Sequence, residues 1–222
     1  MKAKSPIILG LVSIPVLAVL LLWLGKEYPW GTWRYRVTVE IVTPEGIKTG
    51  SAVRELRVHT EPGFLGVRKQ GVAHLVGEAV VIDLGERGVL FALLSEDDIF
   101  HAFPYNNGAG VKAPDGIRFY NGLRPDITGQ LPREHYPRFA IFEDMQDPNT
   151  LRLIYGSHLD LETRKSVYVD EVAELLGYGV RIRNVTIEIT DDAVTWGVEN
   201  VIPHFGPVPR PIGFDDFVRK GR

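Results

Sequence analysis

The pattern of hydrophobic and polar positions divides the chain into one long apolar segment and a longer, alternating remainder. Residues 6–24, from Pro6 to Leu24, contain no charged side chain, and Ser13 carries their only hydroxyl group. At about 1.5 Å per residue, this segment makes a helix of roughly 28 Å, close to the ~30 Å hydrocarbon core of a bilayer. We therefore predict a transmembrane helix at 6–24 that binds the lipid bilayer and is kinked at Pro15.

Two other interpretations of this segment are a buried core helix and a cleavable secretory signal. A core helix normally keeps a polar face, and this segment has none. The basic leader at 1–5 resembles that of a signal peptide, but the apolar run exceeds the usual 7–15 residues or so. No small-x-small cleavage motif follows it in the linker at 25–32. The sequence thus favours an uncleaved anchor over both alternatives.

Charges and aromatic residues around the segment predict its orientation and its interface. Lys2 and Lys4 precede it, whereas Lys26 on the other side is offset by Glu27. The positive-inside rule then places the N-terminus in the cytoplasm and the following domain in the periplasm. The aromatic residues near the exit of the segment resemble an interfacial belt: Trp23, Tyr28, Trp30 and Trp33.

After the linker, the chain alternates with a period of two. Apolar side chains from Trp33 to Ile41 fall on one face, which predicts a half-buried strand at 33–41. Residues 43–46 supply turn chemistry, and a second strand at 47–60 pairs back as a hairpin. The apolar spacing between Val53 and Leu56 is three, so we predict a β-bulge near Arg54 and Glu55.

The strongest fold signal is a pair of apolar runs at 76–84 and 89–94 around the glycine-bounded turn 85–88. Such runs predict a hairpin covered on both faces at the centre of the core. Glu78 and Asp83 lie in it, and two carboxylates can form an acid/base couple. The alternative, which the alternation favours, turns Asp83 to a strand end and Glu78 to a rim.

The last third is also ordered in part. We predict a strand at 151–155. A short helix follows, with Asp170 as its N-terminal cap and Gly177 at its end. Its apolar face consists of Val172, Leu175 and Leu176. A strand follows at 179–190, with a bulge near Asn184 where the apolar phase changes. Residues 203–222 are a proline-rich C-terminal tail that lies along the surface or hangs free.

The fold class is mostly β for residues 33–202: a β-sandwich or partly open barrel with one or two short helices, preceded by a single transmembrane helix.

Composition and motifs exclude several classes of chemistry. The net charge is −3 and the basic residues are dispersed, so nucleic acid is not a predicted partner. The chain has no cysteine, which removes disulfides and thiolate metal sites. Its six histidines show neither H-x-H nor H-E-x-x-H spacing, and there is no G-x-S-x-G or G-x-x-x-x-G-K-[ST] motif. We predict no metal and no cofactor.

Between residues 95 and 137 the periodicity fails, and 103–116 reads as a long, turn-rich loop. Long loops in compact domains are commonly functional or mobile. Polar and aromatic side chains of the kind that suit a partner surface concentrate here. The predicted partner or ligand loop comprises His101, Tyr105, Asn106, Asn107, Arg118 and Tyr120. A connection without a ligand is the alternative.

Four segments together carry a family resemblance. They are the hairpin G-E-A-V-V-I-D-L-G-E-R-G-V-L-F-A-L-L at 77–94, the strand led by Trp33 with T-P-E-G behind it, D-P-N-T at 147–150 and T-I-E-I-T-D-D-A-V-T at 186–195. In these segments the chain resembles a group of uncharacterised single-pass membrane proteins of proteobacteria. The resemblance implies a bacterial inner-membrane protein and implies no activity or functional residue.

These observations lead to two functional hypotheses from different classes. The first is a non-enzymatic, membrane-anchored interaction or scaffold module that holds a membrane or periplasmic protein through the loop around residues 100–120. The second is a periplasmic hydrolase whose site is assembled from distant residues, with His101 and Glu143 or Asp144 as candidates. A concave pocket that gathers histidines and carboxylates would favour the enzyme, and an exposed apolar or aromatic surface would favour the module.

Overall fold

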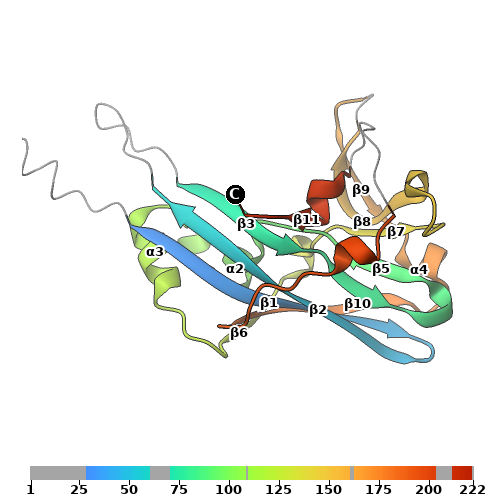
Figure 1. Cartoon of the computed structure of the whole chain (residues 1–222), viewed down its shortest axis with the longest axis horizontal. Coiled ribbons are helices and arrows are strands. Elements are labelled where there is room, and N and C mark those ends of the chain that lie inside the picture. The colour runs from blue at the N-terminus through green and yellow to red at the C-terminus, as the bar shows by residue number, and fades with distance from the viewer. Residues whose placement is uncertain (1–28, 61–70, 109, 161–162, 204–211, 222) are drawn as a thin grey trace, which may run out of the picture.

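Two antiparallel sheets packed face to face form the fold. The computed structural model describes residues 29–60, 71–108, 110–160, 163–203 and 212–221 (Figure 1). The first sheet has the order β11-β3-β2-β1-β10-β6, and the second has the order β4-β5-β7-β8-β9. The predicted β-rich, sandwich-like class is therefore confirmed. The strands are β1 (Trp30–Thr43), β2 (Gly46–His59), β3 (Val72–Glu78), β4 (Val80–Asp83), β5 (Val89–Ala92), β6 (Thr128–Gln130), β7 (Phe139–Phe142), β8 (Leu151–Leu159), β9 (Ser166–Asp170), β10 (Arg181–Ile189) and β11 (Val218–Arg219).

Short helices connect the strands. Among the described residues, the α-helices are α2 (Asp98–Ala102), α3 (Pro114–Asn121) and α4 (Val172–Leu176). The 3₁₀ turns are η2 (Gly85–Arg87), η3 (Asn106–Gly108), η4 (Arg133–His135), η5 (Pro148–Thr150), η6 (Val198–Asn200) and η7 (Phe214–Asp216). The prediction anticipated α4 but not α2 or α3. Asp170 does not cap α4, because it belongs to β9, and Glu171 precedes the helix without a side-chain cap.

The hairpin of β1 and β2 is the longest feature of the first sheet. Its register runs without a break from Trp30 opposite His59 to Thr43 opposite Gly46. The predicted bulge near Arg54 and Glu55 is therefore wrong. The alternation of β1 itself is confirmed, because its apolar residues from Trp33 to Ile41 are all buried.

The spacing of three between Val53 and Leu56 has another cause. Arg54 occupies the core-facing position that alternation assigns to an apolar residue, opposite Tyr35 of β1. The Val53 side chain points to the other face and is buried there, and the Val53 backbone N–H donates to the Thr195 hydroxyl at 3.1 Å along the edge of the strand. Both faces of β2 are covered at this point, so a regular strand can carry three consecutive buried residues.

The second predicted bulge is confirmed. Glu40 of β1 lies opposite Asn184 of β10, but Ile41 lies opposite Ile182, which leaves Arg183 as the extra residue. The bulge lets Ile182 and Val185 both point into the core although their spacing is odd.

The run predicted as one strand at 76–84 is divided between the two sheets. β3 ends at Glu78 in the first sheet, and β4 starts at Val80 in the second. Gly77 has φ +143°, and a Cβ added there would lie 3.0 Å from the Arg54 side chain. Chain crossing and close approach thus explain a glycine at this position. The hairpin of β4 and β5 is confirmed, with Val80 opposite Ala92.

The two carboxylates of this region have separate structural contacts. Asp83 is exposed, and its Oδ1 accepts the Gly85 N–H at 2.8 Å in the turn. Glu78 is buried, not at a rim, and its Oε2 accepts the Val198 N–H at 2.8 Å. These contacts support the structural interpretation of both residues.

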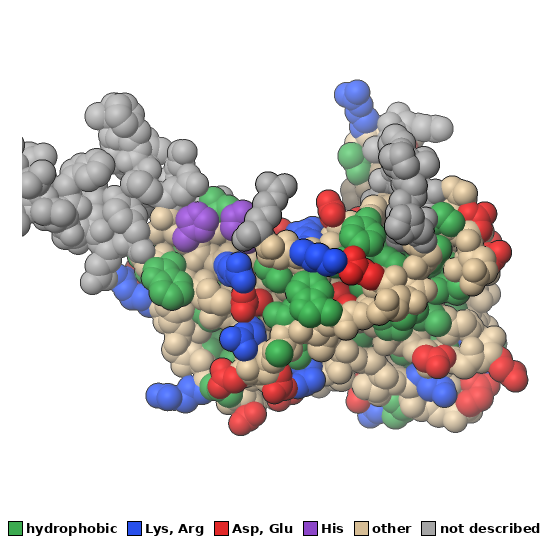
Figure 2. Space-filling model, viewed as in Figure 1, with side chains coloured by type: hydrophobic (Ala, Val, Ile, Leu, Met, Phe, Trp, Pro, Cys, Tyr) green, Lys and Arg blue, Asp and Glu red, His purple; other side chains and the backbone are tan. Residues whose placement is uncertain are grey.

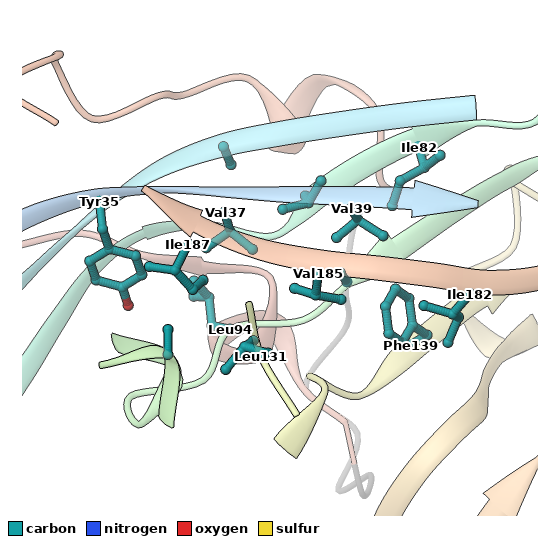
Figure 3. Packing of buried hydrophobic residues seen from close by; sticks show 14 of the residues in the cluster. Tyr35, Val37, Val39, Ile82, Leu94, Leu131, Phe139, Ile182, Val185 and Ile187 are labelled. Atoms are coloured by element: carbon teal, nitrogen blue, oxygen red, sulfur yellow. The ribbon is translucent and has the colours of Figure 1, made fainter. Parts of the chain in front are cut away.

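Aliphatic and aromatic side chains from both sheets fill the space between them (Figure 3). Val37 and Val39 of β1 and Val185 of β10 meet Ile82 of β4 and Phe139 of β7 there. The other face of the second sheet carries a separate apolar cluster. The central hairpin is therefore covered on both faces, as its continuous apolar pattern predicts.

The cover over this outer face comes from the end of the chain. Ile212, Phe217 and Val218 are buried in the second cluster, and β11 pairs with β3. The Phe217 carbonyl accepts the Ala79 N–H at 2.7 Å. The prediction of a tail beyond residue 202 is therefore wrong for residues 212–221, which belong to the fold. Its proline-rich part, 204–211, lies outside the described residues.

The predicted transmembrane helix at 6–24 also lies outside the described residues. Among those that the structure describes, no helix has the length and hydrophobicity to cross a bilayer. Of the predicted aromatic belt, Trp30 is 70% exposed. Trp33 is instead a core residue, and its indole N–H donates to the Asn121 side-chain oxygen at 2.8 Å.

The most polar feature of the interior is an ion pair between Arg54 and Asp98. Both side chains are fully buried, and an Arg54 guanidinium nitrogen lies 2.7 Å from Asp98 Oδ2. The same guanidinium donates to the carbonyl oxygens of Glu78, Ala92 and Leu93. One side chain thus joins β2 to the chain crossing, to the end of β5 and to the start of α2.

Burial shifts the titration of the groups around this pair. Burial raises the pKa of Asp98 to about 6, against the opposing effect of the Arg54 charge. Burial, followed by the Asp98 charge, raises the pKa of Tyr35. At neutral pH, Asp98 is therefore ionised beside Arg54 and Tyr35 is neutral.

We predict that Arg54→Met lowers the free energy of unfolding by about 3–5 kcal/mol, because it leaves a buried carboxylate without its cation. The double variant Arg54→Met/Asp98→Leu should lose less than Arg54→Met alone, since it buries no unpaired charge. Urea unfolding at neutral pH measures both. Arg57→Met, on an exposed position of the same strand, is the control, and we expect a cost below about 1 kcal/mol. A double variant less stable than Arg54→Met would contradict this account.

Candidate functional site

Within the predicted loop at 103–116, the described residues are mostly irregular, with η3 inside the loop and the start of α3 at its end. The wider stretch without periodicity, 95–137, also contains α2, the rest of α3, β6 and η4. Ile117 and Tyr120 of α3 are buried, whereas Arg118 and Phe119 lie on its exposed face. The sequence pattern did not predict these helices, because glycine, proline and asparagine are frequent in this stretch and are typical of turns.

Tyr120 is a core residue and does not belong to a surface. Its side chain is fully buried, and its hydroxyl donates to the Phe103 carbonyl at 2.9 Å. Its ring contacts those of Phe100 and Trp33, with centroids 5.1 and 5.3 Å away. Burial raises the pKa of Tyr120 to about 12. The prediction of a ligand-facing Tyr120 is therefore wrong.

The other predicted loop residues are at least partly exposed. Asn106 and Asn107 adopt positive φ angles of 44° and 52°, a conformation that asparagine tolerates better than most residues. Arg118 pairs with Asp115 at 2.8 Å along α3. Tyr105 packs its ring on Phe119 at 5.2 Å. These contacts shape the turn and the helix surface, and they do not converge on one point.

His101 makes a contact that the sequence did not predict. Its ring stacks on that of His135, with centroids 3.5 Å apart and planes 6° from parallel. Burial lowers the pKa of His101, the neighbouring His135 lowers it further, and Asp97 opposes both effects. The His101 imidazole is thus held in its neutral form, which can pack against a second ring.

Tyr136, the residue after His135, begins a second set of ring contacts along the second sheet, and the two sets together form an aromatic row. Tyr136 lies 6.5 Å from Tyr155, and Tyr155 lies 5.7 Å from Tyr168, measured between ring centroids. Tyr155 is buried, whereas Tyr168 is 59% exposed. The row leads from α2 through η4 and β8 to β9, and consists of His101, His135, Tyr136, Tyr155 and Tyr168.

The row ends on the hairpin of β8 and β9, which projects from the body of the protein (Figure 1). β9 is the last strand of the second sheet, so its outer edge has no neighbouring strand among the described residues. Three large apolar side chains of the hairpin are exposed: Leu159 (54%), Val167 (37%) and Tyr168 (59%).

Edge strands usually carry devices that prevent pairing with other chains, such as lysine, proline or a bulge. β9 reads S-V-Y-V-D and contains neither lysine nor proline. Its pairing with β8 is regular from Leu159 opposite Ser166 to Tyr155 opposite Asp170. A regular edge with a V-Y-V centre that the described residues leave open is a template for a further strand.

A groove of about 620 Å³ lies beside β3 and β11 and is a second feature of the surface. Its basic residues already have partners in the chain. Arg57 pairs with Glu55 at 2.7 Å, and Arg219 pairs with Glu96 at 2.5 Å. Basic and acidic side chains are interspersed in the same way over the face in Figure 2. The groove therefore offers little unbalanced charge for an ionic ligand.

The residues of the hydrolase hypothesis have different partners. Glu143 pairs with Arg152 at 3.2 Å, and Asp144 Oδ1 accepts the Gln146 N–H at 2.8 Å in a turn. His101 stacks on His135. In the described part of the chain, no group of three histidine, aspartate or glutamate residues could hold a metal ion. Nothing in these contacts favours the hydrolase.

The sequence contains only a weak signal for β9 and its aromatic contacts. The run V-Y-V at 167–169 is typical of a strand. Whether such a strand lies in the centre or at the edge of a sheet depends on the order of the strands, which the run itself does not encode.

The comparisons with known proteins add no relative: no family model, no curated protein and no solved structure matches this chain.

We predict that acidification weakens the stack of His101 on His135. The folded pKa of His101 is below its ordinary value of 6.5, so its contribution to stability is present above that pH and is lost as the pH falls through the folded pKa. Unfolding free energies measured between about pH 7.5 and pH 5 should decline more in the wild type than in His101→Phe, which keeps a flat ring that does not titrate. Parallel curves for the two proteins would refute this prediction.

Proposed function

We propose that this protein is a membrane-anchored interaction module of the bacterial envelope that binds an extended segment of a partner protein along β9. The observation that carries the proposal is the outer edge of β9, which the described residues leave open and on which Val167 and Tyr168 are exposed. The apolar segment at 6–24 supports the anchor, and the resemblance to single-pass membrane proteins supports the bacterial envelope.

Addition of a strand to β9 would combine two kinds of interaction. Backbone N–H and C=O groups of the edge would pair with the partner and supply affinity, while the side chains on the two faces would supply specificity. The five residues of β9 span about 17 Å, which accommodates a segment of similar length. Tyr168 would act as the anchor residue, because it is large, amphipathic and supported from below by Tyr155.

The aromatic row would support this surface from within, because Tyr155 is buried, and would connect it to the predicted partner loop. Of that loop, His101 takes part through its stack on His135, and Tyr136 joins it to the hairpin. A membrane anchor would confine the module and a membrane-bound partner to the same surface. Confinement raises the effective concentration, so a short edge can suffice for binding.

The proposal predicts crosslinks that depend on the edge. A photo-reactive amino acid placed at Tyr168 in the full chain should form a discrete adduct with a second protein in bacterial membranes. The same group at Tyr178, which is 96% exposed but lies outside the sheet, should not form it. Val167→Lys adds the kind of charge that blocks edge pairing, and it should reduce the adduct at Tyr168 severalfold.

The controls separate loss of the edge from loss of the fold. The Val167→Lys protein should unfold at the same urea midpoint as the wild type, because Val167 is already partly exposed. An adduct that persists in this variant, or that forms equally from Tyr178, would rule out β9 as the binding edge.

A further inference from the structure

The end of the domain at which β1 begins presents aromatic side chains to the surroundings. Trp30 is 70% exposed and Phe119 is 38% exposed. Asn121, at the end of α3, connects the two segments: its side-chain N–H donates to the Trp30 carbonyl, and its side-chain oxygen accepts the Trp33 indole N–H. Figure 1 places α3 beside the start of β1, at one end of the long axis.

Phe119 is not required by the core. α3 buries Ile117 and Tyr120 on its inner face, and Phe119 lies on the outer face with Asp115 and Arg118. Its ring packs on that of Tyr105, which is partly exposed. Phe119 and Tyr105 therefore place apolar area on a side of the helix where polar residues are the norm. Trp30 lies at the same end of the domain but on the opposite face of β1, because the next residue, Gly31, faces Trp33 and Asn121. These three side chains, Trp30, Tyr105 and Phe119, define the aromatic surface of this end.

The chain itself limits how far this surface can lie from the predicted anchor. Trp30 follows Leu24, the last residue of the apolar segment, by six residues. A fully extended chain covers at most about 3.6 Å per residue, so Trp30 lies within roughly 22 Å of the end of that segment. The polar headgroup region is itself roughly 5–7 Å deep on each side of the hydrocarbon.

We propose that this end of the domain, with Trp30 on one side of β1 and Tyr105 and Phe119 on the other, docks end-on on the phospholipid bilayer, with the Trp30 and Phe119 rings in the headgroup region. The proposal rests on the anchor of the proposed function. Tryptophan and tyrosine favour this zone because their rings have an apolar body and a polar group. A tethered surface needs little intrinsic affinity, since the linker holds it at a high effective concentration near the lipid.

Docking at this end fixes how the rest of the domain is presented. β1 has 14 residues and spans about 45 Å, so the β1–β2 turn would point away from the membrane. Tyr178 lies at that distal end, where Gly179 approaches Pro44 of the turn. The β8–β9 hairpin projects across the long axis (Figure 1) and would therefore reach sideways over the membrane towards a neighbouring protein.

Fluorescence of single-cysteine variants tests this surface in the full-length protein. The chain has no cysteine, so Phe119→Cys and Tyr178→Cys each give one labelling site, and both positions are exposed. Each variant, labelled with an environment-sensitive fluorophore, is reconstituted into vesicles of phosphatidylcholine and phosphatidylglycerol. We expect spin-labelled headgroups to quench the label at 119 severalfold more than the label at 178, and we expect a blue-shifted emission only at 119.

Carbonate extraction of the same vesicles distinguishes failure of the docking surface from failure of the membrane anchor. Equal quenching at 119 and 178 in protein that resists carbonate would overturn the docking surface and leave the anchor intact. Strong quenching at 119 in protein that carbonate releases would support the docking surface and overturn the anchor. Release by carbonate without preferential quenching at 119 would overturn both. Circular dichroism of each labelled variant, matched to the wild type, shows that the fold is retained.

Discussion

The buried ion pair of Arg54 and Asp98 is the interaction that fixes how the two sheets meet. Removal of two charges from water is costly, and only good geometry and further hydrogen bonds compensate for it. Arg54 meets this condition, because its guanidinium contacts the Asp98 carboxylate and three backbone carbonyls. Those carbonyls belong to the crossing between β3 and β4 and to the end of β5. A different alignment of the sheets would leave the buried charge without these partners.

The chain crossing beside this pair gives the sandwich its form. Gly77 allows the backbone to pass close to Arg54, and the strand then leaves the first sheet and enters the second. The second sheet is thereby covered on one face by the first sheet and on the other by side chains from residues 198–202 and 212–218. The Arg138–Asp216 pair and the hydrogen bonds of Phe217 and Asp216 hold this cover in place. The central strands of the second sheet are thus filled on both faces, and the outer edge of β9 is left open by the described residues.

The domain has two candidate binding surfaces, and they differ in the groups that they expose. The edge of β9 offers regular backbone groups and a supported tyrosine, which suit an extended protein segment. The end of the domain around α3 offers aromatic rings without a regular backbone edge, which suits an interface between water and lipid. Tyr155 joins the core to the first surface, and Asn121 joins β1 to the second, so a rigid frame holds both.

The sequence alone determined the β-rich class, the β1–β2 and β4–β5 hairpins, the bulge at Arg183 and the short helix α4, because alternation, turn residues and phase changes are local. It did not determine the position of Arg54, whose burial depends on Asp98, 44 residues later in the chain. For the same reason, the exposed edge of β9, the burial of Tyr120 and Trp33 and the stack of His101 on His135 followed only from the tertiary structure. A period of two shows that one face of a strand is covered, but the covering element, and the edge that it leaves open, depend on contacts between distant segments.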